Sequence, residues 1–196
     1  MATPLDPARP DLSGQMRYSR GAMAFHWLIA ALIILNIVGA VATEDMEGPV
    51  RGLAMGMHKA AGMTVLVLSV LRLGWRLGHR PPPLPAAIGR MTALAAHGVH
   101  ALFYLLMFAL PISGWLMISA ASPRRPFNWF GLFDLPYLPV EGDKALQVVA
   151  HDAHELLFYL ILALLVLHVA GALRHHFAHG RTFLFRMMPG QRRTGI

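Results

Sequence analysis

The chain has 196 residues, of which 56% are hydrophobic and 14% charged, and its mean hydropathy is +0.50. These values lie outside the usual range of soluble globular domains and predict a membrane protein. The chain contains no cysteine, which excludes disulfides, thiolate zinc sites, iron–sulfur clusters and covalently attached c-type haem. A redox metal would therefore need other ligands, and the 11 histidines are the obvious supply.

Four apolar stretches are each long enough to cross a hydrocarbon core about 30 Å thick, which takes about 20 helical residues. The first is too long for a cleavable signal peptide and follows a polar segment, so we expect it to stay in the mature protein. In the third, Pro111 and Gly114 are expected to kink the helix without ending it. The sequence thus predicts an all-α, four-transmembrane-helix bundle with helices at residues 22–42, 53–77, 91–120 and 146–173.

The basic residues outside these stretches predict the orientation of the bundle. Arginines that precede the first stretch, follow the second and populate the tail have few acidic neighbours, whereas the first and third connections carry several Asp and Glu residues. The positive-inside rule then places residues 1–19 and the basic tail 177–196 in the cytoplasm, on either side of a four-helix domain at 20–176. The net charge of +7 and the pI near 10.8 indicate this topology and contact with anionic lipid. They do not indicate nucleic-acid binding, for which no recognition motif is present.

Four histidines in the apolar stretches match in depth. His26 and His168 fall at the cytoplasmic end of the bundle, and we call them the inner pair; His58 and His154 fall at the periplasmic end, and we call them the outer pair. The 14-residue step from His154 to His168 covers about 21 Å and returns to within about 40° of one helix face. A lone histidine on an apolar helix is usually a satisfied core residue. Four that match on three helices indicate function, because ionisable groups in a bilayer are costly.

Two imidazoles at each level suit the two axial positions of a b-type haem, whereas zinc prefers three or four ligands at one level. We therefore expect two haems b inside the bundle. Arg72 lies 14 residues after His58 and so returns to the same face at the depth of the inner pair. It is placed there to pair with a haem propionate; the alternative is an arginine that extends to the lipid headgroups.

These residues also carry a family resemblance. The segments "YSRGAMAFHWLIA", "MHKAAGMTVLVLSVLRLGWRL", "AHGVHALFYLLMFALPISGWLM" and "HELLFYLILALLVLHVAGALRHHF" resemble the four helices of the bacterial cytochrome b561 family, over residues 18–190. The resemblance implies a bacterial inner-membrane cytochrome with His26, His58, His154 and His168 as haem ligands. It is strongest to stand-alone dihaem members that act as oxidoreductases, transferring electrons from superoxide to ubiquinone. It also implies a quinone site that uses His100 and His175, for which the alternative is interfacial histidines solvated by headgroups and water.

Basic residues in the periplasmic connections allow two interpretations. Together they form a positive funnel that attracts a small anion such as superoxide, or they are ordinary loop charges among acidic neighbours. These residues are Arg51, Lys59, Arg124, Arg125 and Lys144. The aromatic loop at 124–139 shows no clean period and is expected to lie on the membrane surface.

Two further functions stay open. The chain is alternatively an electron-carrying subunit for a periplasmic dehydrogenase or reductase, which would require a docking partner. A four-helix membrane anchor without redox chemistry is a third interpretation, but it leaves the matched histidine pairs unexplained.

Overall fold

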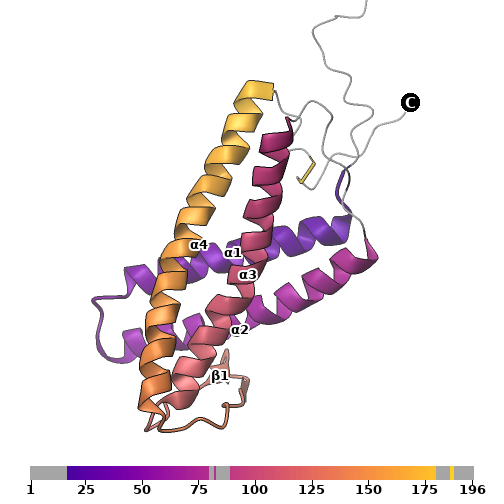
Figure 1. The fold of residues 1–196 in the computed structure, drawn as a ribbon. Helices are drawn as coiled ribbons and strands as arrows, with labels where there is room; N and C mark the ends of the chain where they lie inside the picture. The colour runs from indigo at the N-terminus through magenta and orange to yellow at the C-terminus, as the bar shows by residue number, and fades with distance from the viewer. Residues whose placement is uncertain (1–16, 80–81, 83–88, 180–185, 188–196) are drawn as a thin grey trace, which may run out of the picture.

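The computed structural model describes residues 17–79, 82, 89–179 and 186–187 (Figure 1). Its elements, in chain order, are α1 (Arg20–Ala42), α2 (Gly48–Gly78), α3 (Arg90–Ala120), β1 (Asn128–Trp129), β2 (Phe133–Asp134) and α4 (Lys144–His179). All four helices are long and apolar enough to cross a membrane. The predicted four-helix, multi-pass membrane architecture is confirmed.

The helices extend beyond the stretches that hydropathy marks. α2 begins at Gly48, with a proline in its first turn, and α4 continues to His179. Proline at the start of a helix is favourable because its fixed φ suits the helix and its missing N–H has no intrahelical partner to lose. Hydropathy falls where polar residues begin, whereas the backbone remains helical beyond that point. α3 continues through Pro111, as predicted.

The helices pack as two hairpins. α1 packs against α2 and α3 against α4, and α2 also contacts α3; Figure 1 shows the two hairpins crossing one another. Only 6% of the most apolar window of α1 is buried within the protein. Most large apolar side chains therefore face outward, where lipid would solvate them.

Two small apolar clusters fill the middle of the bundle. Val65 lies midway along α2 between His58 and Arg72, and Ile161 lies midway along α4 between His154 and His168. The buried members of the clusters are Ile29, Val65 and Met107, and Leu106, Ile161 and Leu164. A packed apolar layer thus separates the inner histidine pair from the outer one.

A short β-hairpin between α3 and α4 was not predicted. Asn128 pairs with Asp134 and Trp129 with Phe133, and both central turn residues, Phe130 and Gly131, have positive φ (50° and 77°). Such a turn usually carries Asn-Gly or Asp-Gly. Because Phe130 stands at the first of the two positions, the sequence does not predict the hairpin.

The loop that contains this hairpin folds against the helices. The indole nitrogen of Trp129 donates to Thr64 Oγ1 on α2 (2.9 Å), and that of Trp115 on α3 donates to the carbonyl of Pro136 (2.9 Å). Phe127 is buried, whereas Phe133 remains exposed. Part of the loop therefore covers the outer end of the bundle, because two indole N–H groups donate to partners there and Phe127 is buried. Its expected position at the membrane surface stays a prediction.

The expected cytoplasmic segments, residues 1–19 and 177–196, lie largely outside the described residues. Where they are described, they meet. The backbone N–H of Tyr18 donates to the carbonyl of Arg186 (3.3 Å), and the indole N–H of Trp27 donates to that of Met187 (2.7 Å). A piece of the tail therefore lies against the start of α1.

Close packing between α1 and α2 at this end provides a stability prediction. A Cβ on Gly21 would lie 2.6 Å from Cε2 of Trp75, so Gly21→Ala should destabilise the protein by about 1–3 kcal/mol, the usual effect of overpacking. The measurement is thermal unfolding in detergent. Gly39→Ala is the matched control, since a Cβ there meets no described atom within 4 Å. Equal melting temperatures for the two variants would contradict the prediction.

Candidate functional site

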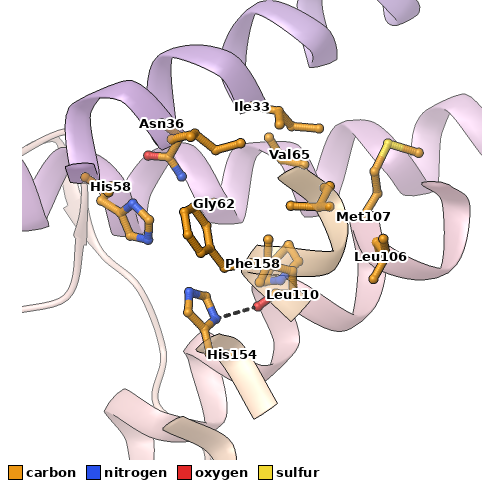
Figure 2. A pocket seen from close by; sticks show the side chains of 14 residues that line it. Ile33, Asn36, His58, Gly62, Val65, Leu106, Met107, Leu110, His154 and Phe158 are labelled. Carbon is orange, nitrogen blue, oxygen red and sulfur yellow. Dashed lines mark hydrogen bonds between the residues drawn. The ribbon is translucent and has the colours of Figure 1, made fainter. Parts of the chain in front are cut away.

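The outer pair lies between the two helical hairpins. His58 is on α2 and His154 on α4, and their ring centres are 6.1 Å apart. Both line a cavity whose other walls are mostly apolar, and Figure 2 shows the two rings pointing into it. Cofactor pockets combine apolar walls with a few well-placed polar groups. The cavity has the lining of such a site.

The hydrogen bonds of His154 determine which of its nitrogens is free. Its Nδ1 lies 3.0 Å from the carbonyl oxygen of Leu110 (Figure 2) and 3.0 Å from Ser113 Oγ. A carbonyl only accepts, so Nδ1 carries the proton and donates. In the neutral ring Nε2 then holds the lone pair, and a metal-binding histidine is commonly held by this kind of bond from its other nitrogen.

Two glycines shape the walls beside the outer pair. Gly62, one turn after His58, lines the cavity, and a Cβ on it would meet no described atom within 4 Å. Gly114 lies against His154, where a Cβ would be 3.1 Å from Cε1 of the ring. His58 Nδ1 is buried and makes no hydrogen bond of ordinary length and angle among the described residues, with the backbone of Asn36 as its nearby polar neighbour. At this level the described residues thus leave a cavity and imidazole nitrogens that are available to bind a cofactor.

The inner pair likewise consists of two neighbouring imidazoles on different helices. His26 on α1 and His168 on α4 have ring centres 6.3 Å apart, and Phe103 on α3 packs 5.3 Å from the His168 ring. Half-buried Arg72 on α2 is an electrostatic neighbour of both histidines. Its guanidinium also lies 5.5 Å from the ring of Tyr104. All four helices therefore contribute a side chain at this depth, and Arg72 lies where the sequence predicted it.

The ring separations suit one metal ion held between each pair. An imidazole–metal bond is about 2 Å long, so two opposed imidazoles on one metal have ring centres on the order of 6 Å apart. Within the described part of the chain, no group of three or more His, Asp or Glu side chains is placed to hold a metal ion. The arrangement fits two-ligand axial coordination better than a clustered zinc site.

Comparison with known proteins identifies the family of the chain. Residues 17–190 match the family described as prokaryotic cytochrome b561. The chain belongs to this family. This prokaryotic cytochrome b561 is 34% identical to cytochrome b561 homolog 2 of Escherichia coli K12, over 88% of this chain and 91% of the relative. It is 31% identical to probable superoxide oxidase CybB of Yersinia pestis (90% and 98%) and 26% identical to cytochrome b562 of Cereibacter sphaeroides (87% and 94%).

Family membership establishes the broad activity. The cytochrome b561 described here is a membrane electron-transfer protein of a family that binds haem b. The resemblance drawn from the four helical segments is confirmed. Which residues bind haem, and how many haems are bound, stay predictions.

The two residues predicted for a quinone site differ in what the structure describes. His100 is exposed on α3, and its ring centre is 5.9 Å from that of His168. His175 belongs to α4, but its side chain lies outside the described residues. His97 lies one turn before His100 and bonds the carbonyl of Ala93 in its own helix (2.7 Å). The described side chains thus place His100 beside the inner pair, and the position of the His175 side chain stays a prediction.

The basic residues of the outer connections separate into two groups. Arg124 forms a salt bridge with Glu141 (3.3 Å), and Arg51 donates to the carbonyl of Thr43 (2.8 Å). Lys59 donates to the carbonyl of Pro126 and lines a second cavity, of about 380 Å³, together with His58 and His154. Arg125 is an electrostatic neighbour of Lys59. The ordinary structural interpretation therefore suits Arg124. Arg51 and Lys59 both place positive charge beside His58, and Arg125 adds charge next to Lys59.

Sequence inspection missed the groups that hold His154. Pro111 and Gly114 were interpreted only as causes of a kink, and Ser113 between them was not considered. The available signal was a small polar residue and a glycine in an apolar helix, at the depth of a histidine on the neighbouring helix.

Proposed function

We propose that this cytochrome b561 transfers electrons from periplasmic superoxide to ubiquinone across the bacterial inner membrane. The overall reaction oxidises two superoxide anions to two molecules of dioxygen and reduces one quinone, which takes up two protons to become the quinol. The observation that carries the proposal is the pair of neighbouring imidazoles at each of two depths, with ring centres 6.1 and 6.3 Å apart. The relative named probable superoxide oxidase supports the choice of donor.

Four histidines and one arginine hold the cofactors in this proposal. Two haems b, when bound, supply one-electron carriers at the two depths. His58 and His154 would hold the haem at the outer level, and His26 and His168 would hold the haem at the inner level. Arg72 provides a guanidinium for a propionate of the inner haem, since it is half-buried beside both inner ligands and a charge-assisted bond to a carboxylate is strong.

The outer end favours a small anionic donor. Lys59 lines the cavity next to His58 and His154, and Arg125 adds a second positive charge. Clustered charge of one sign raises the local concentration of an oppositely charged substrate and its association rate. Superoxide donates a single electron, so this end of the protein needs neither a general base nor a hydride acceptor.

The inner end favours an apolar acceptor that arrives from the lipid. His100 is exposed on α3, beside His168, and we propose that it binds the quinone together with His175. An imidazole can donate a hydrogen bond to a quinone carbonyl and supply a proton when that oxygen is reduced. With residues 1–19 and 177–196 in the cytoplasm, these protons come from the cytoplasmic side.

Stopped-flow absorbance of the purified protein tests the function. Superoxide should reduce the haems at a near diffusion-limited rate that falls as ionic strength rises, because salt screens electrostatic steering. Added ubiquinone should then reoxidise them. Lys59→Gln should slow the reduction and weaken its salt dependence, whereas Arg90→Gln, at the other end of the bundle, should not. If superoxide acts no faster than a generic reductant and without salt dependence, the proposed donor is wrong. The alternative, an electron-transfer subunit for a periplasmic dehydrogenase or reductase, would then be favoured.

A further inference from the structure

We infer that Ser113 and Gly114 of α3 are positioning residues for His154, and that together they set the orientation and basicity of its Nε2. The inference rests on the proposed role of His154 as a haem ligand. Both residues lie next to the ring of His154, at the outer level.

Ser113 is a second hydrogen-bond acceptor for the N–H at Nδ1 of His154. Its hydroxyl oxygen lies 2.8 Å from the carbonyl oxygen of Leu110 and 3.0 Å from His154 Nδ1. The carbonyl cannot donate, so the hydroxyl hydrogen points to Leu110, and the lone pairs of the serine oxygen are left to accept from Nδ1–H. His154 thus donates between two acceptors, which fixes both the rotation of the ring and the nitrogen that carries the proton.

Gly114 lets the ring approach the backbone of α3. A Cβ at this position would lie 3.1 Å from Cε1 and 3.3 Å from Nδ1 of His154, closer than an ordinary van der Waals contact of about 3.5–4.0 Å. Even an alanine would therefore require the imidazole to shift by a few tenths of an ångström. The glycine and the serine act on the same ring from adjacent positions of one helix.

A serine in an apolar helix often bonds a carbonyl of its own helix and does nothing else. Ser69 in α2 is such a case, since its buried hydroxyl donates to the carbonyl of Val65 (2.7 Å). The 3.0 Å contact with Nδ1 distinguishes Ser113 from this purely structural arrangement. Ser69 is accordingly the matched control.

The two acceptors have a consequence for the redox potential. Hydrogen-bond acceptors on the distal nitrogen raise the basicity of a ligating histidine, and a more basic ligand favours ferric over ferrous iron. Ser113→Ala removes one of the two acceptors, so it should raise the midpoint potential of the outer haem. A tenfold change in the ratio of ferric to ferrous affinity corresponds to about 59 mV for one electron.

The experiment is a redox titration with low-temperature electron paramagnetic resonance on the purified holoprotein. The outer component is assigned as the one lost in His58→Ala and kept in His26→Ala. Ser113→Ala should raise the outer midpoint potential and change the outer low-spin signal, with the inner component unaltered. Ser113→Thr, which keeps a hydroxyl, should restore both, and Ser69→Ala should change neither. Gly114→Ala should alter the outer signal or lower the occupancy of the outer haem.

Three results would overturn the inference, and they differ in what else they overturn. If the wild-type protein holds an outer haem whose potential and signal are the same in Ser113→Ala, the positioning role is wrong while the proposed ligand set stands. If His154→Ala keeps every haem component that the wild type has, the ligand set and the inference are both refuted. Equal shifts of both components in Ser113→Ala would also refute it, because they indicate a general structural effect.

Discussion

His58→Ala and His154→Ala are each expected to lower the haem content of the purified protein from about two haems per chain to about one, since each would remove one of the two proposed haem ligands at the same level. His26→Ala and His168→Ala should lose the other haem. The reason is the pairing in space, with ring centres 6.1 Å apart in the outer pair and 6.3 Å apart in the inner pair. The two members of a pair should therefore produce the same spectral loss.

Pyridine haemochrome analysis measures the content, and low-temperature difference spectra identify the haem that is lost. Both haems should be extractable by acid acetone, because the chain has no cysteine for covalent attachment. His97→Ala is the control, since its ring bonds a carbonyl of its own helix. A wild-type protein with one haem or none would contradict the four-ligand assignment. A His26→Ala spectrum that matches His58→Ala would contradict the pairing.

The second large effect is expected at the quinone end. His100→Ala should slow reoxidation of the haems by ubiquinone on the order of 10²-fold, the usual cost of removing a proton donor, and leave their reduction by superoxide unchanged. His100 is exposed beside His168, with ring centres 5.9 Å apart, so it is accessible to a lipid-borne acceptor. Double-mixing stopped-flow measures the two half-reactions separately.

The control for this experiment lies one turn away on the same helix. His97→Ala removes an imidazole that is bonded to the Ala93 carbonyl, and it should leave reoxidation at the wild-type rate. His175→Ala should slow reoxidation in the same direction as His100→Ala. Haem content is measured in each variant, because His100 neighbours a proposed ligand. Reoxidation that is equally fast in His100→Ala and the wild type, at full haem content, would show that the quinone binds elsewhere.

The sequence by itself determined the helices and the depth of each histidine. Both depend on properties that are local to one segment: an apolar run of sufficient length predicts a span, and a fixed rise and turn per residue place His154 and His168 on one face about 21 Å apart. The same arithmetic placed Arg72 at the inner level. Hydropathy misplaced the ends of α2 and α4, because a helical backbone continues past the last apolar side chain.

Only the tertiary structure decided how the helices lie side by side and what surrounds each ring. Helix crossing depends on how side chains of separate segments interdigitate, so spacing along one helix does not reveal that Ser113 and Gly114 contact His154 from α3. The β-hairpin depends on positive φ at Phe130. Phenylalanine rarely adopts this conformation, so the sequence does not predict the turn. Likewise, folding joins Arg124 to Glu141 while it leaves Lys59 beside the outer pair, because charges distant in sequence meet only once the loops have packed.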